Sequence, residues 1–519
     1  MPDPFYITTA INYPNGPPHV GHAYEAIATD VIARFQRLSG RDVFFQTGTD
    51  EHGLKMAQAA RERGVTPQAL ADEMSDLFRN MADRLNISYD RFIRTTEPAH
   101  HKASQAIWQA MADRGDIYLG RYEGWYSVRD EAYYDQSEVE LGEAGEKLSP
   151  QGTPVEWTVE ESWFFRLSAY QERLLAYYAE NPDFIRPEAR RNEVLRFVEG
   201  GLSDLSISRT SFDWGVRPPG SEGHVMYVWL DALTNYLTGT GYPDTGSETY
   251  KRFWPADLHV IGKDVVRFHA VYWPAFLMSA GLPLPRRVFG HGHVLLRGEK
   301  MSKSAGNVVG PEEMVEAFGV DAVRYFMVRD VTFGQDGSYS PEAIVTRVNA
   351  DLANSFGNLA QRTLSFIAKN CEGALPVGGR DEPADAELLA TVRSATGVEL
   401  PGAFEELALS QGVEAWMRAV FACNRYIDAQ APWALRKTDP ERMTAVLATL
   451  CSAIVDLAVA ISPVVPSAAA RLLDQMGVPG SERDFAALQD RGRYERLAGS
   501  GFTLQPPTPI FPRLEPAPT

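Results

Sequence analysis

Two short stretches, far apart in the chain, carry residues suited to phosphate chemistry. The first, NGPPHVGH at 15–22, holds His19 and His22 on one side of a helical turn, and Gly21 lets a ligand approach the backbone closely. Proline suits the first turn of a helix, so a helix beginning here would point its positive dipole end at phosphate. The histidines also fit a locally packed helix cap, or a zinc pair for which no third ligand is evident nearby.

The second stretch, RGEKMSKSAGN at 297–307, places Arg297, Lys300 and Lys303 among glycine and serine residues. Lysines on a flexible segment can reach a polyphosphate and stabilise the charge that develops on it in a transition state. A solvated loop is the alternative for any single lysine. The pentapeptide KMSKS is far more specific than its parts.

An alternation of strand and helix patterns surrounds the first stretch. Residues 4–11 have the composition of a β-strand, and apolar residues then recur at steps of three and four from Val20 to Leu38. A buried strand follows from Asp42 and stops at Gly48, with polar residues at its carboxyl end, and a further helix is predicted from Pro67 to Leu85. This alternation predicts a Rossmann-like, doubly wound parallel sheet whose ligands bind beyond the carboxyl ends of its strands.

At 519 residues the chain is too long for one hydrophobic core. Aromatic, charged and turn-rich sequence interrupts the α/β pattern, and long amphipathic helices with few strand signals follow it, which predicts a helical bundle. The predicted divisions are the first half of the α/β domain at 1–114, an inserted connective domain at 115–224, the second half at 225–295, the KMSKS loop and linking helices at 296–347, the helical domain at 348–500 and a Pro-rich tail at 501–519.

The composition is that of an ordinary globular protein, with 44% hydrophobic and 23% charged residues. No run of about 20 apolar residues and no leader pattern is evident, so we expect neither a membrane span nor a secretory signal. Cys371, Cys423 and Cys451 lie far apart and fit buried thiols in a reducing cytoplasm. The net charge of -18 argues against indiscriminate nucleic-acid binding, but it does not exclude a local basic face.

Taken together, the two stretches resemble the signatures of class I aminoacyl-tRNA synthetases, and the surrounding sequence resembles the methionyl-tRNA synthetases. The matching segments, in the order of that family, are YITTAINYPNGPPHVGH, YVWLDALTNY, VIGKDVVRFHAVYWPA, GHGHVLLRGEKMSKSAGN and DAQAPW. The resemblance implies activation of methionine by ATP to methionyl-adenylate and transfer to the 3′ end of methionine tRNA, initiator and elongator. Positioning and charge stabilisation then carry the rate, and no protein nucleophile is required.

The resemblance also implies how ATP would be held. His19 and His22 would contact its phosphates and the developing pentavalent phosphorus, and Lys300 and Lys303 would close over the departing pyrophosphate. Magnesium would arrive with ATP. The other residues expected to bind ATP are Gly21, Glu25, Gly262, Asp264, Val294, Met301, Ser302 and Ser304.

For methionine, the resemblance implies that Asp50 binds the ammonium group. The side-chain pocket would be lined by Ile11, Tyr13, Trp229, Ala232, Leu233, Tyr236, Val265 and His269. An aromatic, polarisable wall suits a thioether. Leu233 and Val265 stand where some relatives have proline and isoleucine, but both remain apolar. Without the resemblance, Trp229 and Tyr236 would more often be assigned to a buried core.

The insert departs from many relatives, which carry cysteine pairs that bind zinc. Here Ser127 and Asp130 stand where the first pair would lie, and no cysteine precedes Cys371. We therefore expect no structural zinc. The insert is expected to hold together by apolar packing that uses Trp125, Tyr126, Tyr133 and Trp163.

In the helical domain, Asn358 and Arg362 are four residues apart and share a helix face, and Trp433 follows DAQAP. The resemblance implies that these three residues read a CAU anticodon, because unpaired bases are hydrogen-bonded on their edges and stacked on aromatic rings. Burial between helices is the alternative for Trp433. The candidates for a local basic face are Arg347, Lys369, Arg418, Arg425, Arg436 and Lys437.

Two other functions remain to be weighed. One is a class I synthetase for leucine, isoleucine, valine or cysteine, but the insert at 115–224 is short for a large editing domain and lacks zinc-binding cysteines. The other is an RNA-binding paralogue without catalysis, against which the intact His19, His22, Asp50 and lysine signature argue. We expect a cytoplasmic monomer.

Overall fold

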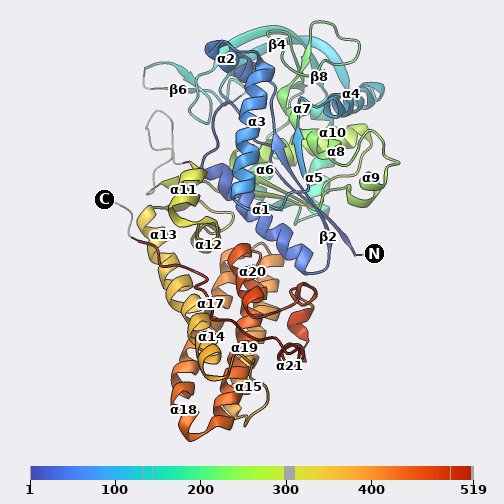
Figure 1. The fold of residues 1–519 in the computed structure, drawn as a ribbon. Coiled ribbons are helices and arrows are strands. Elements are labelled where there is room, and N and C mark those ends of the chain that lie inside the picture. The colour runs from blue at the N-terminus through green and yellow to red at the C-terminus, as the bar shows by residue number, and fades with distance from the viewer. Residues whose placement is uncertain (1, 131, 143, 297–309, 491, 516–519) are drawn as a thin grey trace.

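The computed structural model describes residues 2–130, 132–142, 144–296, 310–490 and 492–515, and it has an α/β half joined to an elongated helical half (Figure 1). The α/β half is built on a six-stranded sheet in the order β3-β2-β1-β13-β14-β9, in which all neighbouring strands are parallel. The predicted fold class, a split Rossmann-like sheet followed by a helical domain, is confirmed.

The strands of this sheet come from widely separated parts of the chain. They are β1 (Pro4–Thr9), β2 (Asp42–Thr49), β3 (Arg91–Arg94), β9 (Ile185–Arg186), β13 (Leu258–Gly262) and β14 (Val288–His291). Every residue of β1 after Pro4 is buried, as is typical of a central strand covered by helices on both faces. Because β1 pairs with β13, the two halves of the split domain share one sheet.

Helices lie on both faces of the sheet (Figure 1). The helices of this half are α1 (Val20–Leu38), α2 (Leu54–Arg63), α3 (Pro67–Arg84), α4 (Pro98–Asp113), α5 (Gln171–Glu180), α6 (Glu188–Glu199), α7 (Val228–Leu233), α8 (Asn235–Thr238), α9 (Glu248–Phe253) and α10 (Trp273–Ala280), with a π-helical turn at Phe268–Tyr272. The helix expected after the two prolines begins at Val20 with His19 as its N-cap. The prolines therefore precede the helix, and their expected place in its first turn is wrong.

The insert is an antiparallel sheet in the order β10-β8-β4-β5. Its strands are β4 (Ile117–Ser127), β5 (Ala132–Tyr134), β8 (Glu156–Phe165) and β10 (Leu205–Ser206), with short pairs β6 (Glu140–Leu141) and β7 (Lys147–Leu148), and β11 (Ser208–Arg209) and β12 (Val225–Met226). The range 115–224 also contains β9, which pairs with β14 of the main sheet. The insert therefore returns to the main sheet before β13, and the predicted boundaries stay a prediction.

A hydrogen-bonded cluster joins the β4–β5 turn to the segment before β8. The Asp130 carboxylate accepts hydrogen bonds from the Tyr134 hydroxyl at 2.9 Å, from Ser149 Oγ at 2.9 Å and from Thr153 Oγ1. Ser127 Oγ lies 2.8 Å from Thr153 Oγ1 and accepts from the Asp130 N–H at 3.1 Å. We call Ser127, Asp130, Ser149 and Thr153 the Asp130 cluster.

Aromatic packing also contributes to the insert, as the sequence predicted. The rings of Tyr126 and Tyr133 lie 4.8 Å apart, and Trp163 packs edge-on against Trp108 of α4. The Asp130 cluster adds polar interactions that the sequence analysis did not foresee. Ser127, Ser149 and Thr153 are almost completely buried, so their hydroxyls depend on one another and on Asp130 for hydrogen bonds.

A short connection links the two halves of the molecule. It consists of β15 (Val294–Leu296), which pairs with β16 (Gly337–Tyr339), and of α11 (Pro311–Phe318) and α12 (Val320–Asp330). Arg324 of α12 is completely buried and donates to Asp30 of α1 at 2.7 Å. It also donates to the carbonyl oxygens of Pro463 at 2.9 Å and Val464 at 3.0 Å, which belong to the helical half.

The helical half extends away from the sheet (Figure 1). Its helices are α13 (Pro341–Val348), α14 (Asn358–Asn370), α15 (Pro383–Ser394), α16 (Leu400–Glu405), α17 (Leu409–Gln430), α18 (Pro432–Thr438), α19 (Pro440–Ile461), α20 (Pro466–Gln475) and α21 (Arg493–Ala498), with π-helical turns at Asn349–Gly357 and Ala395–Glu399. One apolar core runs from α1 and the sheet through α12 into this bundle. The bundle is thus packed continuously onto the α/β half.

One helix of this bundle, α19, is long and apolar enough to cross a membrane by composition. Yet 83% of its most apolar window is buried inside the protein, which is typical of a core helix. The neighbouring thiols of Cys423 and Cys451 are buried, as predicted, and Cys371 is half-buried. The tail at 501–515 has no helix or strand. Asn349 Nδ2 donates to the Leu514 carbonyl at 2.9 Å, and Asn349 Oδ1 accepts from the Leu514 N–H at 2.8 Å.

The Asp130 cluster leads to a stability prediction. In the Asp130→Ala variant the buried Ser149 and Thr153 hydroxyls lose their acceptor, and each such group costs about 1–3 kcal/mol. We expect the insert to lose about 3 kcal/mol of stability. Thermal unfolding and the rate of proteolysis within 115–224 would measure the loss. Glu140→Ala, which changes an exposed acid of the same insert, should leave both unchanged, and equal behaviour of the two variants would contradict the prediction.

Candidate active site

The predicted small-molecule residues converge where four parallel strands end. Ile11 and Tyr13 follow β1, Asp50 follows β2, Asp264 and Val265 follow β13, and Val294 follows β14. Because parallel strands end at the same edge of a sheet, these residues from distant parts of the chain lie along one edge. The amino-terminal part of α1, with its two histidines, faces that edge, since the segment after β1 leads into α1 and Glu25 of α1 bonds His291 at the end of β14.

The two histidines close the first turn of α1. His19 Nδ1 accepts from the Gly21 N–H at 3.1 Å, and His22 Nδ1 accepts from the His19 N–H at 3.2 Å. The rings stack with their centroids 3.7 Å apart. A Cβ atom at Gly21 would lie 3.0 Å from His19 Cε1, so a side chain here would displace the capping ring. His19 and His22 therefore cap the helix, as one of the two alternatives predicted. The same hydrogen bonds fix the direction of both rings.

Since Nδ1 accepts a hydrogen bond in each ring, a neutral imidazole at either position carries its proton on Nε2. The cap therefore presents an Nε2–H donor from each ring. Such donors are suited to phosphate oxygens.

Glu25 lies one turn after His22 and is almost completely buried. Its carboxylate pairs with His291 Nε2 at 2.7 Å, which connects α1 to the end of β14. Burial would lower the pKa of His291, but the hydrogen bond and charge of Glu25 outweigh burial and raise that pKa. This pair fixes the start of α1 against the sheet.

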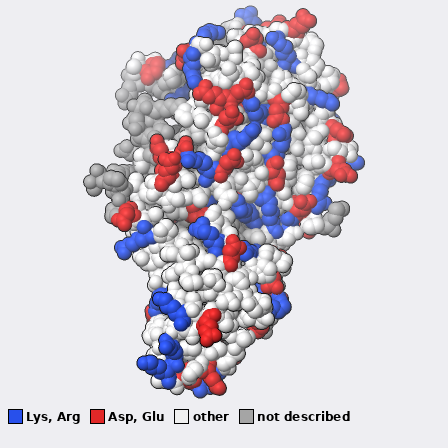
Figure 2. Space-filling view, in the orientation of Figure 1, with Lys and Arg blue, Asp and Glu red and all other residues white. Residues whose placement is uncertain are grey.

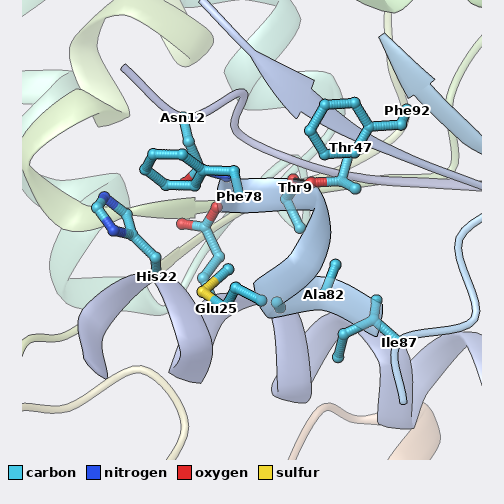
Figure 3. Close-up of a pocket in the computed structure, with 11 residues that line it drawn as sticks. Thr9, Asn12, His22, Glu25, Thr47, Phe78, Ala82, Ile87 and Phe92 are labelled. Atoms are coloured by element: carbon cyan, nitrogen blue, oxygen red, sulfur yellow. Dashed lines mark hydrogen bonds between the residues drawn. The ribbon is translucent and has the colours of Figure 1, made fainter. Parts of the chain in front are cut away.

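A small cavity lies beside this helix start. His22 and Glu25 project from α1, and Thr9, Asn12 and Thr47 come from the strand ends (Figure 3). Its volume of about 10 Å³ has room for at most one water molecule. A nucleotide would therefore lie along the open edge of the sheet and not in this cavity.

Asp50 is buried directly after β2. Its backbone N–H donates to the Asn12 carbonyl at 2.8 Å, and the Asn12 N–H donates to the Gly48 carbonyl at 2.8 Å. These two bonds extend the pairing of β1 and β2 beyond the strand ends. Asp50 is thereby held beside the segment that carries Ile11 and Tyr13.

Four of the predicted pocket residues share one helical face. Trp229, Ala232, Leu233 and Tyr236 follow one another at steps of three, one and three, so they project to the same side of α7 and α8. The Trp229 ring stacks on Phe268 with centroids 3.8 Å apart and planes inclined by 5°. The face is an aromatic and aliphatic wall of the kind predicted for a thioether.

His269 is buried behind this wall in a defined tautomer. Its Nδ1–H donates to the Val265 carbonyl at 2.9 Å, so in the neutral ring Nε2 accepts from the Tyr236 hydroxyl at 2.7 Å. Burial lowers the pKa of His269 to about 4, although the Val265 contact opposes the shift. At neutral pH the wall is therefore uncharged and its hydroxyl is oriented.

The remaining residues expected to bind adenosine lie on β13, β14 and the segments after them. Gly262 ends β13, and a Cβ atom there would meet nothing within 4 Å, which leaves open space above the backbone. Asp264 Oδ2 lies 2.6 Å from His293 Nε2, and Val294 is buried at the start of β15. Lys300, Met301, Ser302, Lys303 and Ser304 lie outside the described residues.

The predicted RNA-binding residues lie far from this edge, in the helical half. Asn358 and Arg362 belong to α14 and Trp433 to α18, and α18 lies at the end of the helical half distant from the sheet (Figure 1). The Arg362 guanidinium lies 5.2 Å from the Trp433 ring centroid and donates to Asp428 at 2.7 Å. Trp433 is 47% exposed, which excludes its burial between helices.

The surface charge around these residues is mixed. Among the predicted basic candidates, Arg347 pairs with Asp330 at 2.9 Å and Arg418 pairs with Glu399 at 2.5 Å. On the face shown in Figure 2, acidic and basic side chains lie side by side. This distribution suits recognition of particular unpaired bases better than unspecific attraction to phosphate.

Sequence reasoning missed several residues that support the site. Phe268, His259 and His291 contact Trp229, Tyr236 and Glu25 respectively. Phe268 and His291 lie within the matching segments VIGKDVVRFHAVYWPA and GHGHVLLRGEKMSKSAGN, and this is the signal that could have identified them. Among the described residues, no group of three or more His, Cys, Asp and Glu side chains could hold a metal ion, and the expectation of no zinc remains a prediction.

Comparisons with known families cover nearly the whole chain. A family model described as tRNA synthetases class I (M) matches residues 5–364. A second, described as the anticodon binding domain of methionyl tRNA ligase, matches residues 375–516. The division between them falls within the helical half.

Individual relatives match over a similar extent. The methionine–tRNA ligase of Rhizobium meliloti is 57% identical over 510 residues, 98% of each chain. That of Mycobacterium tuberculosis (strain CDC 1551) is 57% identical over 519 residues, 99% of this chain and 98% of the relative. A crystal structure of Mycobacterium tuberculosis methionyl-tRNA synthetase bound by methionyl-adenylate has a TM-score of 0.94 and 56% identity, and covers 98% of this chain and 100% of that one.

The buried state of His269 predicts a pH dependence. An exposed histidine in the unfolded chain has a pKa of about 6.5, so between pH 6.5 and 4 the unfolded state binds the proton more tightly than the folded state. Stability is therefore fully present above pH 6.5 and falls as the pH falls. Between pH 7 and pH 5, the free energy of unfolding measured in urea should fall by about 2 kcal/mol more in wild type than in His269→Gln. Parallel pH profiles would contradict a buried neutral His269.

Proposed function

The chain belongs to the methionyl-tRNA synthetases of class I, and from this premise we propose which of its residues carry each step of the ligation. The enzyme activates methionine with ATP to methionyl-adenylate and transfers the methionyl group to tRNA. A methionine carboxylate oxygen attacks the α-phosphorus, the bond from that phosphorus to the bridging oxygen breaks, and pyrophosphate leaves. The residues therefore need only orient the reactants and stabilise charge.

The observation that carries the proposal is the meeting of two chemically different subsites at one sheet edge. The start of α1 presents ring N–H groups and a positive helix end, as an anionic phosphate requires. The face of α7 and α8 presents an uncharged aromatic wall, as a thioether requires. Asp50, held at the same sheet edge by its bond to Asn12, is suited to the methionine ammonium.

On the phosphate side, His19 and His22 donate from Nε2 to the ATP phosphates and to the pentavalent phosphorus as charge develops. Donors held rigidly by a helix cap need little reorganisation as the transition state forms, which is the basis of electrostatic catalysis. Glu25, Gly262, Asp264 and Val294 receive the adenosine, supported by the open space above Gly262. Lys300 and Lys303 close over the pyrophosphate. Mg²⁺ enters with ATP and offsets its negative charge.

On the methionine side, Trp229, Tyr236 and His269 receive the side chain together with Ile11, Tyr13, Ala232, Leu233 and Val265. The bond from Tyr236 to His269 supports this role because it fixes the hydroxyl away from the apolar ligand. The pocket then offers methionine dispersion and sulfur–aromatic contacts. Leucine and isoleucine differ from methionine in shape, and each misplaced methylene is worth about 1–3 kcal/mol.

At the other end of the molecule, Asn358, Arg362 and Trp433 recognise the CAU anticodon. The contact between Arg362 and Trp433 supports this role because it fixes an exposed ring on which a base can stack. The enzyme acts as a monomer in the cytoplasm.

The activation step is tested by ATP–pyrophosphate exchange. The purified chain should catalyse exchange that depends on methionine, and leucine, isoleucine, valine and cysteine should each give at least about fivefold less, as a shape difference of about 1–3 kcal/mol implies. Exchange supported by none of these amino acids would contradict the proposal and favour an RNA-binding paralogue without catalysis. Exchange supported best by another of them would assign a different class I synthetase.

The anticodon residues are tested by separating the two steps. In Trp433→Ala, loss of a stacking surface worth about 1–3 kcal/mol should lower kcat/KM for tRNA charging by about 5- to 150-fold. Methionine-dependent exchange should stay within about twofold of wild type, because α18, which carries Trp433, lies at the end of the molecule distant from the sheet (Figure 1). Phe421→Ala, which removes another exposed aromatic ring of the helical half, is the matched control. A Trp433→Ala variant that loses exchange and charging equally would show a structural role.

A further inference from the structure

Asp231 is a completely buried carboxylate between two histidines, and no step of the ligation uses it. Its Oδ2 lies 2.7 Å from His52 Nδ1, and its Oδ1 lies 2.6 Å from His100 Nε2. All three side chains are at most 3% exposed. Burial alone would raise the pKa of Asp231, but His52 and His100 outweigh burial and hold it well below its usual range. The carboxylate is therefore an anion.

The three residues belong to three elements that meet behind the proposed methionine site. His52 follows Asp50 by two residues at the end of β2. Asp231 lies on α7, between Trp229 and Ala232 in sequence. His100 lies on α4, where its Nδ1 also contacts Thr238 Oγ1 of α8 at 3.0 Å. One carboxylate thus joins the strand end that carries Asp50 to the helices that carry the aromatic wall.

Other contacts restrict the same strand end. The Trp214 ring packs edge-on against His52, and its Nε1–H donates to the Glu51 carbonyl at 2.6 Å. Glu51, also fully buried, accepts from Arg94 at 2.7 Å. Trp214 and Arg94 thus fix the segment from Asp50 to His52, and Asp231 connects this segment to α7.

The geometry explains why a charge lies at this position. A buried anion is costly unless it is paired, and each histidine donor satisfies one carboxylate oxygen. A bond to an ionised group is shorter and roughly twice as strong as one between neutral groups, so small displacements are penalised more steeply. The ammonium and side-chain subsites are proposed to hold opposite ends of one small ligand, so their spacing determines whether both contacts form together.

We propose that Asp231 is a positioning residue for methionine, which through His52 and His100 holds Asp50 and the Trp229–Tyr236 face at one fixed spacing. The inference rests on the proposed function, because it takes Asp50 and this face as the two halves of the methionine site. It assigns Asp231 no contact with the substrate. Its effect is on methionine binding and not on the phosphate chemistry.

The test compares a variant that removes the charge with paired histidine variants that keep or remove the donor to Asp231. Asp231→Asn keeps the shape and removes the charge. His52→Asn keeps a donor near the position of Nδ1, and His100→Gln keeps one near Nε2, whereas His52→Ala and His100→Ala remove those donors. Asp351→Asn is the matched control, since Asp351 is a buried carboxylate of the helical half that accepts from Tyr325.

In ATP–pyrophosphate exchange, Asp231→Asn should raise KM for methionine at least about tenfold, while kcat and KM for ATP stay within about threefold, as expected for loss of ground-state positioning. The two alanine variants should behave like Asp231→Asn. The His52→Asn and His100→Gln variants should recover most of the methionine affinity, and Asp351→Asn should match wild type.

Several outcomes would overturn the inference. An unchanged methionine KM in folded Asp231→Asn would do so. An equal rise of this KM in the donor-keeping and alanine variants would also do so, because it would indicate a general loss of packing and no role for the donors. If Asp231→Asn does not fold, the paired histidine variants decide. Absence of exchange in wild type would instead refute the proposed function. Equilibrium dialysis would then compare the methionine affinity of wild type and Asp231→Asn, and equal affinities would overturn the inference.

Discussion

The buried ion pair between Asp30 and Arg324 holds the two halves of the molecule in register. Arg324 has no exposed surface and bonds the carbonyl oxygens of Leu85, Pro463 and Val464 as well as Asp30, so it contacts the α/β half and the helical half at once. Removing one partner of a buried pair leaves an uncompensated charge, which costs about 3–5 kcal/mol. Asp30 lies ten residues after Val20 on α1, about 15 Å along the helix at 1.5 Å per residue. One helix therefore connects this junction to the histidines proposed to contact phosphate, and an enzyme with an anticodon-binding domain in one half and the proposed adenylate site in the other needs such a rigid relation.

Burial sets opposite protonation states on the two sides of the site. His269 has no acidic neighbour among its hydrogen-bond partners, so desolvation keeps it neutral behind the aromatic wall. His291 is equally buried but faces Glu25, and the pair favours the charged form. The same residue type thus serves an uncharged subsite and a charged one. The difference depends on the partner each ring meets and not on the depth of burial.

Much of this arrangement could be predicted from the sequence, because periodicity defines elements and parallel strands share an edge. The strand, helix and strand at the start of the chain place His19, His22 and Asp50 together before any coordinates are known. The partners of charged residues within the core could not be predicted. Asp231 lies in the segment VWLDALTNY, where its position relative to His52 and His100 depends on tertiary packing.

The Asp130 cluster was missed for the same reason, since serine and threonine in a loop carry no sign of burial. The start of α1 was misplaced because proline is compatible both with a first helical turn and with the segment before it.

The helix cap of α1 has a consequence for how these positions can vary. An N-cap can be supplied by Asn, Asp, Ser or Thr, each of which has an oxygen that accepts from the helix start. None of them carries a ring with a second nitrogen directed away from the cap. His19 and His22 each combine the acceptor that the helix needs with a donor on the opposite side of the same ring. Substitutions that supply another N-cap would thus preserve the fold but remove the second donor, so the requirements of folding and those of the proposed phosphate contacts differ within one helical turn.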